Sequence, residues 1–182
     1  MTPATDQIAT DPIATDPIAT DQEPTMASDA VARFTARAEA VGIEVRTSTF
    51  PAGTRTAVDA AAAVGCDVAQ IVKSLVFNAD EGPVLALVSG ANRVDEGKLA
   101  AALNAASVRK ADADEARAAT GYAIGGTPPF GHDTRLAVLC DQDLTAHDEL
   151  WAAAGTPMDV FPVTPAELIV ASAATVADIA DS

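Results

Sequence analysis

Two apolar segments joined by a short polar turn constrain the fold of this chain more than any other feature of its sequence. The segments are residues 71–77 and 84–88, and the turn between them is Ala79-Asp80-Glu81-Gly82-Pro83. Apolar runs of this length, rich in Val and Ile and bounded by turn residues, predict strands. A connection this short predicts that the two strands pair antiparallel as a hairpin. The hairpin disfavours a sheet in which all strands are parallel.

Helix signals alternate with further strand signals along the rest of the chain. Apolar patterns predict additional strands at residues 43–48, near 108, and at 136–140, 151–154 and 158–163. Capping residues predict helices or helical turns that begin at Ser28, Thr56, Asp67, Asp95, Asp112 and Thr164. Interleaved helices and strands that include hairpins favour a mixed α+β fold, in which helices surround a mixed sheet, over a Rossmann arrangement.

Residues 1–25 differ in composition from the rest of the chain. A five-residue unit of the form Thr-Asp-Gln/Pro-Ile-Ala begins at Thr5, Thr10 and Thr15. Its period matches neither a helix nor a strand, and its five acidic residues without any Lys or Arg carry a charge of −5. We predict a disordered acidic repeat tail at 1–25 and a folded domain at 26–182. The alternatives are that translation begins at Met26, or that the tail is an interaction segment.

The overall composition excludes several classes of protein. Hydrophobic residues make up 49% of the 182 residues, which excludes disorder of the whole chain. No apolar run reaches the roughly 18 residues that span a bilayer, and the N-terminus lacks the basic and apolar regions of a secretory signal. Cys66 and Cys140 stand far apart, a pattern typical of neither a disulfide framework nor a zinc site. We expect a cytoplasmic protein with no membrane contact.

Lys73 is the first candidate functional residue. It lies inside the predicted strand 71–77, where apolar side chains on both faces indicate burial. A lysine in such a strand is unfavourable unless its ammonium reaches water or an anion. Lys73 is therefore a candidate for binding an anionic group. The alternative is a lysine that protects an edge strand or extends its ammonium to solvent.

The second candidate is the loop Gly125-Gly126-Thr127-Pro128-Pro129-Phe130-Gly131. Adjacent glycines allow backbone amides to approach a ligand, and the prolines stiffen the loop. Rigid N–H donors of this kind suit an oxyanion, or a carbonyl that becomes one. The alternative is a tight structural crossing of two chain segments.

Other familiar motifs of catalysis and cofactor binding are missing from the sequence. It contains no GxGxxG after a strand, no GxxxxGK[ST] and no GxSxG. His132 and His147 lack metal-ligand spacing and are expected to be solvated, so no metal centre is predicted. Cys140 is typical of a small core residue, and Asp141-Gln142-Asp143 of a helix cap with solvated charges.

Three segments of the sequence resemble the YbaK/EbsC family, the freestanding relatives of the editing domain inserted in bacterial prolyl-tRNA synthetases. The strand lysine and the glycine-rich loop occur in the family's order and at a family-like spacing. The resemblance covers roughly residues 31–170, and residues 1–25 have no counterpart. The segments that carry it are Ile71-Val72-Lys73-Ser74-Leu75-Val76-Phe77, Leu87-Val88-Ser89-Gly90-Ala91-Asn92-Arg93-Val94-Asp95 and Thr120-Gly121-Tyr122-Ala123-Ile124-Gly125-Gly126-Thr127-Pro128-Pro129-Phe130-Gly131-His132.

The resemblance implies a barrel-like mixed sheet ringed by helices, and a trans-editing activity that hydrolyses the ester bond of mischarged aminoacyl-tRNA. The mechanism it implies needs no metal, no cofactor and no protein nucleophile. Lys73, on which the family's key lysine falls, would hold the acceptor-end phosphate or the ester carbonyl, and loop amides would stabilise the oxyanion. The residues on which the family's aminoacyl pocket falls are Gly125, Gly126, Pro129, Phe130 and Gly131 in the loop, and Gly155 and Thr156 in a second turn.

The substrate implied by the resemblance is tRNA(Pro) that carries a small amino acid such as alanine or cysteine. The expected partners are the acceptor end of the aminoacyl-tRNA and, for delivery, prolyl-tRNA synthetase or an elongation factor. Two features favour a different interpretation: family members often carry Asp where Ala91 stands, and the net charge of −15 is unlike the basic stripe of most tRNA binders. The alternative is a non-catalytic binding module that uses the same pocket for an aminoacyl-like small ligand or a protein partner.

Overall fold

The computed structural model describes residues 26–181. The predicted acidic repeat tail at residues 1–25 lies outside the described residues. In the described part of the chain, no helix is long and apolar enough to cross a membrane.

An eight-stranded sheet forms the centre of the molecule. Its order is β1-β7-β6-β2-β3-β5-β8, and β4 also pairs with β2. Antiparallel pairs (β1·β7, β2·β3, β2·β4, β6·β7) occur beside parallel pairs (β2·β6, β3·β5, β5·β8), so the predicted mixed sheet is confirmed. The strands are β1 Ser48–Thr49, β2 Ile71–Ala79, β3 Gly82–Ser89, β4 Val108–Lys110, β5 Ala137–Asp141, β6 Leu150–Ala153, β7 Asp159–Val163 and β8 Thr175–Ala177.

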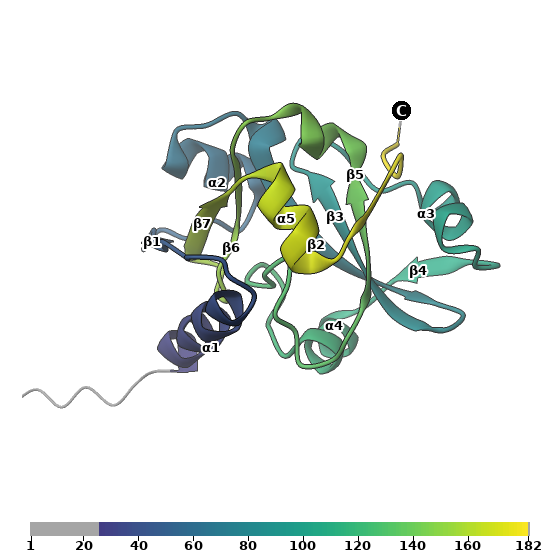
Figure 1. Cartoon of the computed structure of the whole chain (residues 1–182), viewed down its shortest axis with the longest axis horizontal. Helices are drawn as coiled ribbons and strands as arrows, with labels where there is room; N and C mark the ends of the chain where they lie inside the picture. Colours follow the sequence, from purple (N-terminus) through teal and green to yellow (C-terminus); the bar gives the residue numbers. More distant parts are fainter. Residues whose placement is uncertain (1–25, 182) are drawn as a thin grey trace, which may run out of the picture.

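Helices surround this sheet, as predicted. In Figure 1, α5 crosses the near face of the sheet, α1 and α4 lie along its lower side, and α3 lies beside β4. The α-helices are α1 Met26–Ala40, α2 Ala57–Val64, α3 Glu96–Leu103, α4 Ala113–Thr120 and α5 Pro165–Ser172, and the short 3-10 helices are η1 Val68–Gln70 and η2 Gln142–Ala146.

Local capping interactions fix where most helices begin. Thr56, Asp95, Asp112 and Thr164 each accept a hydrogen bond from the backbone N–H three residues later, as the sequence predicted. Asp67 likewise caps η1. These bonds satisfy amide groups that have no partner within the helix itself.

Two local predictions at the N-terminal end are wrong. The first helix begins at Met26, so Ser28 lies inside α1 and is not its N-cap. The predicted strand at 43–48 is reduced to Ser48–Thr49, because β7 pairs with these two residues alone. Ile43 and Val45 pack against the core instead of extending the sheet. A strand requires a partner backbone as well as a suitable sequence.

Buried side chains form separate clusters on the two faces of β2. Val72 and Val76 belong to one cluster, and Phe77 belongs to the other. In the first cluster, the ring of Phe34 from α1 lies 5.3 Å from that of Phe130 and 5.0 Å from that of Phe161. These contacts attach α1 and the glycine-rich loop to the sheet.

Candidate functional site

A cavity of about 460 Å³ lies beside β2. Its walls come from β2, from β6, from the segment that leads into α2, from the junction of β4 with α4, and from the loop at Ile124, Gly125 and Thr127. The volume falls in the range of small-molecule sites. Trp151 on β6 lines this cavity, and its indole N–H donates to Glu149 at 3.1 Å.

The cavity exists because the outer edge of β2 changes partner partway along. β6 pairs with Ile71 and Val72, and β4 pairs with residues 77–79, so neither strand pairs with residues 73–76 on that edge. The carbonyl of Val76 accepts from Ala111 across the gap, so alternation along the strand points the backbone N–H and C=O of Ser74 toward the same gap. The split sheet therefore presents backbone polar groups to the cavity.

Lys73, the first candidate from the sequence, lines this cavity. Its ammonium is half-buried and donates a hydrogen bond to the backbone carbonyl of Asn92. Desolvation lowers the pKa of Lys73. The nearby positive charges of Lys110 and Arg93 lower this pKa further, whereas the negative charge of Asp141 raises it. Among the described residues, no carboxylate forms an ion pair with Lys73. An anionic or carbonyl oxygen in the cavity would therefore find an available cation.

The turn that carries the Asn92 carbonyl is held by two carboxylates. The side-chain amide of Asn92 donates to Asp141 and to Asp143, both at 2.8 Å. Asp141 also accepts from the backbone N–H of Ser89 at 3.2 Å and caps η2. The sequence suggested a cap with solvated charges at this position. The cap is confirmed, but Asp141 is fully buried, at 0% exposure, because β5 ends against the turn after β3.

The glycine-rich loop contributes one of its predicted residues to the cavity wall. Gly125 lines the cavity in a left-handed conformation, with φ +85°. Gly126 is buried behind it, and a Cβ on residue 126 would lie 2.6 Å from the Cα of Thr156. Gly126 thus makes the tight chain crossing that was the alternative interpretation of the loop. The crossing brings the loop against the second predicted turn, at residues 155–156.

The other predicted pocket residues lie behind the cavity wall. Pro129 and Phe130 are buried, and Phe130 belongs to the core cluster. The carbonyl of Gly131 accepts from Arg37 at 2.7 Å. Gly155 packs closely on α1, and the hydroxyl of Thr156 donates to Asp159. These residues support the loop and the turn in this structure.

Two further polar side chains lie close to the loop and in β2. His132 is half-buried and its Nε2 lies 2.8 Å from the carbonyl oxygen of Pro128, so the expectation of a solvated histidine is wrong for this residue. Ser74 lines the cavity, and its buried hydroxyl has no hydrogen-bond partner among the described residues. No sequence pattern indicated a role for Ser74, because its environment depends on which strands leave the gap beside β2.

Three exposed cations lie around Lys73, and we call them the cationic rim: Arg55, Arg93 and Lys110. Arg55 and Lys110 line the cavity, and Arg93 and Lys110 are close enough to lower the pKa of Lys73. No carboxylate in the described part of the chain forms an ion pair with any rim residue. The three residues lie far apart in the sequence, and no sequence pattern predicted that they would lie around Lys73.

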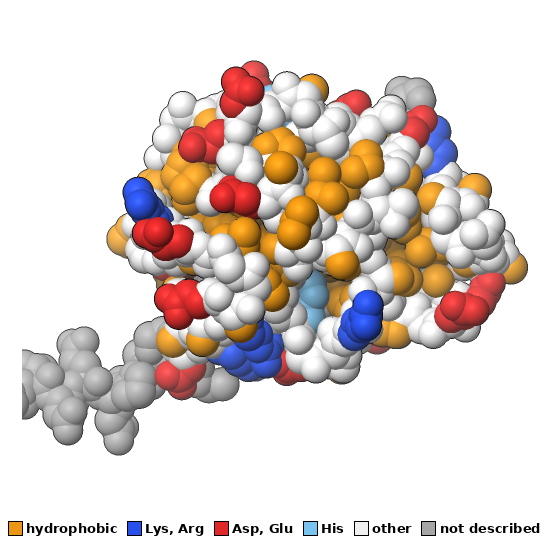
Figure 2. Space-filling view, in the orientation of Figure 1, with side chains coloured by type: hydrophobic (Ala, Val, Ile, Leu, Met, Phe, Trp, Pro, Cys, Tyr) orange, Lys and Arg blue, Asp and Glu red, His pale blue; other side chains and the backbone are white. Residues whose placement is uncertain are grey.

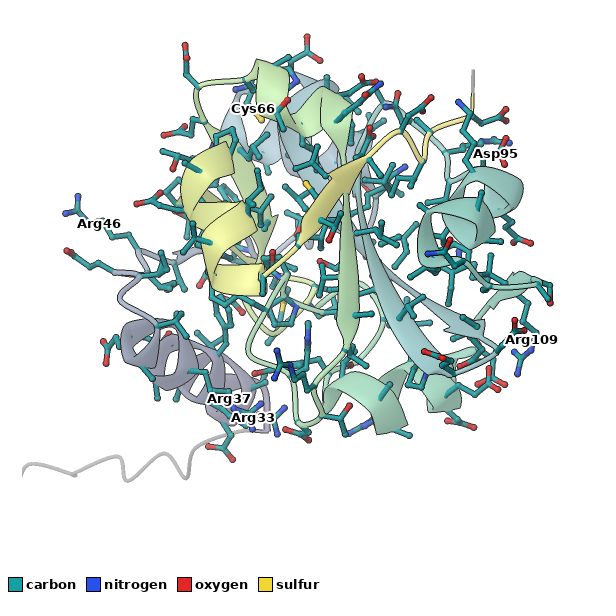
Figure 3. The ribbon with its side chains drawn as sticks, turned by 45° about the vertical axis from the view of Figure 1, so that its right-hand side comes forward. Arg33, Arg37, Arg46, Cys66, Asp95 and Arg109 are labelled. Carbon is teal, nitrogen blue, oxygen red and sulfur yellow. The ribbon has the colours of Figure 1, made fainter. Side chains whose placement is uncertain are left out.

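Several cations outside the rim are paired with carboxylates. Arg46 and Arg109, at opposite sides of the molecule in Figure 3, contact Glu44 and Glu115 at 3.2 and 2.6 Å. On the face in Figure 2, acidic and basic side chains are interspersed, and no continuous basic stripe crosses it. At the cavity, Arg55 and Lys110 form no ion pair with any carboxylate of the described residues. Within residues 26–181, no group of His, Cys, Asp or Glu is arranged to hold a metal ion.

Comparison with known proteins identifies the family. A family model for the aminoacyl-tRNA editing domain matches residues 51–170. The proline–tRNA ligase of Ligilactobacillus salivarius is 38% identical over 90 residues, or 50% of this chain and 16% of the ligase. That of Nitratidesulfovibrio vulgaris (strain DP4) is 29% identical over 147 residues, or 75% of this chain and 25% of the ligase. The chain thus spans at most a quarter of these two ligases.

Solved structures of similar size agree in fold. One, described as a candidate trans-editing enzyme for prolyl tRNA synthetase, is 45% identical, with a TM-score of 0.80 over 84% of this chain and 98% of that one. A scaffold protein from a study of computational epitope grafting is 42% identical, with a TM-score of 0.81 over 85% of this chain and 99% of that one. With its mixed sheet and the cavity beside the lysine strand, the chain belongs to the aminoacyl-tRNA editing domain family.

Proposed function

We propose that this protein is a trans-editing hydrolase that removes a wrongly attached amino acid from aminoacyl-tRNA. The single observation that carries the proposal is the position of Lys73, whose half-buried side chain lines an open cavity in a member of the editing family. The reaction is hydrolysis of the ester between the amino acid and the terminal ribose. It yields a free amino acid and an uncharged tRNA.

The substrate is tRNA(Pro) that carries a small amino acid such as alanine or cysteine. Support comes from the wall of the cavity. Its apolar lining includes Val72, Val76, Ala111 and Val160, and the buried hydroxyl of Ser74 has no hydrogen-bond partner among the described residues. Further support comes from the relatives, which are proline–tRNA ligases and a candidate trans-editing enzyme for prolyl tRNA synthetase. A small aliphatic or thiol side chain of the attached amino acid suits a cavity with these apolar walls.

Catalysis rests on positioning and electrostatics. The Lys73 ammonium and the backbone N–H groups of Ser74 and Gly125 polarise the ester carbonyl, and a water molecule attacks its carbon. The oxygen of the resulting tetrahedral intermediate carries the negative charge that these donors stabilise. The carbon–oxygen bond to the ribose then breaks, and the ribose oxygen takes up the proton that the water gives up. No protein nucleophile takes part.

The cationic rim provides the contact with the acceptor end of the tRNA. Arg55, Arg93 and Lys110 are exposed and form no ion pair with a carboxylate of residues 26–181, so phosphates beside the ester can bind them without displacing one of those carboxylates. An acidic protein with a local cationic site binds tRNA with modest affinity. Prolyl-tRNA synthetase or an elongation factor, in the cytoplasm, would then deliver the substrate.

A deacylation panel tests this proposal. The full chain and its Lys73→Ala variant are incubated with tRNA charged with alanine, cysteine, serine, threonine or proline, and amino acid release is followed. Release of one amino acid by the wild type, lost in the variant, supports the proposal and names the substrate. Silence of a folded wild-type protein across the panel overturns it in favour of the non-catalytic binding module.

A further inference from the structure

The carboxylate of Asp141 is fully buried, at 0% exposure, although it lies outside the cavity wall. Three groups donate to it: the backbone N–H of Ser89 at 3.2 Å, the side-chain amide of Asn92 at 2.8 Å and the backbone N–H of Asp143 at 3.1 Å. A buried carboxylate is costly unless it is hydrogen-bonded in this way. One of the three bonds comes from the last residue of β3 and another from Asn92 in the turn that follows, so Asp141 fixes that turn to the end of β5.

The turn itself is tightly built. Asn92 N–H donates to the carbonyl of Ser89 at 3.0 Å, and the hydroxyl of Ser89 donates to Ala69 at 2.9 Å. A Cβ on Gly90 would lie 2.3 Å from the carbonyl oxygen of Val68, so the turn packs closely against the backbone of η1. The carbonyl of Asn92 in this turn accepts the hydrogen bond from the Lys73 ammonium.

We infer that Asp141, acting through Asn92, is a positioning residue that holds the Lys73 ammonium at the cavity. Lysine has a flexible four-carbon stem, and a fixed acceptor at its end selects one of many arrangements. The inference rests on the proposed function, because the position of Lys73 matters for catalysis only if Lys73 acts on the ester. Asp141 itself touches neither the substrate nor the cavity.

Electrostatics give the inference a second readout. The charged groups that act on Lys73 are Lys110 and Arg93, which lower its pKa, and Asp141, which raises it. Asp143, on the other side of the Asn92 amide, is exposed. Removal of the Asp141 charge therefore lowers the pKa of Lys73 further, and the ammonium is lost at a lower pH.

The test compares Asp141→Asn and Asn92→Ala with wild type in the full chain. Asn92→Ala keeps the backbone carbonyl but removes its anchor. We expect kcat to fall roughly 10- to 100-fold in both variants, because a displaced catalytic group costs about that much. KM should change less than threefold, because the cationic rim is intact. Asp95→Asn, a conservative change at the cap of α3, serves as the control and should keep the wild-type kcat.

A readout without substrate separates this inference from the proposed function. Competitive labelling of lysines with acetic anhydride, followed by mass spectrometry, gives the titration of Lys73 directly. Asp141→Asn should shift that titration to lower pH, even if no tRNA in the panel is a substrate. Wild-type kcat together with an unshifted titration in Asp141→Asn overturns the inference. If Asp141→Asn does not fold, kcat of Asn92→Ala decides: a loss supports the inference and a wild-type value overturns it.

Discussion

The ammonium of Lys73 donates a hydrogen bond to the backbone carbonyl of Asn92, which lies 19 positions later in the chain. Lys73 is on β2, and Asn92 follows β3, the strand paired with β2. The hairpin predicted from two apolar segments is therefore what brings these residues together. On the opposite edge of β2, residues 73–76 pair with neither β6 nor β4, and the cavity lies beside this gap.

Replacement of Ser74 by alanine should separate stability from activity. The buried Ser74 hydroxyl has no hydrogen-bond partner in the described part of the chain, and such a group costs about 1–3 kcal/mol. We expect Ser74→Ala to melt at the same temperature as wild type or higher, while kcat/KM falls roughly tenfold through loss of one substrate hydrogen bond. The control is Ser172→Ala, since the Ser172 hydroxyl is bonded to Leu168 at 2.6 Å. Ser172→Ala should lose stability and keep kcat/KM. If Ser74→Ala instead loses stability and keeps kcat/KM, the Ser74 hydroxyl does not bond the substrate.

Gly126→Ala should damage both the fold and the site. The added Cβ would lie 2.6 Å from the Cα of Thr156, so the loop must move away from the turn beneath it. We expect a loss of about 1–3 kcal/mol in the free energy of unfolding, measured by denaturant titration. Gly97→Ala in α3 is the matched control, because the nearest atom to its Cβ is a side-chain oxygen of Asp95 at 3.2 Å. Equal stability of Gly126→Ala and wild type would show that the crossing is not tight.

The cationic rim should determine how binding responds to salt. Each phosphate contact contributes about 0.7–0.9 to the slope of log K against log salt concentration. We expect Arg55→Ala, Arg93→Ala and Lys110→Ala each to weaken tRNA binding and to reduce that slope by about one contact. Arg46→Ala, which removes an exposed arginine paired with Glu44, is the control. A slope unchanged in all three rim variants would place the tRNA elsewhere.

Activity should decline on the alkaline side at a lower pH than an ordinary lysine would give. Burial and two neighbouring cations lower the pKa of Lys73, and in the mechanism proposed above the protonated form is the active one. As pH rises through this lowered pKa, the ammonium and the activity are lost together. The pH profile of kcat, corrected for spontaneous ester hydrolysis, measures this limb. Lys73→Arg keeps its charge, so any activity it retains should show no such limb.

Local features of the fold were predictable from the sequence, and non-local ones were not. Thr56, Asp95 and Asp112 cap helices as predicted, because capping depends on neighbours within three or four positions. The strand at 43–48 failed because its extent depends on β7, more than a hundred residues later. β-propensity alone does not supply a partner.

The same distinction applies to the site. Lys73 was identifiable as a candidate from the sequence, because a charged side chain inside an apolar strand is costly unless it reaches water or an anion. Ser74 and Asp141 were not, because their environments depend on where β2 exchanges β6 for β4 and where β5 ends. The sequence left two interpretations of the glycine-rich loop, a ligand-facing loop and a tight chain crossing. In the structure Gly125 lines the cavity, and Gly126 makes the crossing.

The most direct test of the central claim is single-turnover deacylation of alanyl-tRNA(Pro) by wild type and by Lys73→Ala. No carboxylate of the described chain is left without an ion-pair partner by this change, so the variant should keep the wild-type melting temperature. We predict that its rate falls by at least about 100-fold, the usual cost of losing a main transition-state donor. A Lys73→Ala variant that deacylates at the wild-type rate would contradict the account.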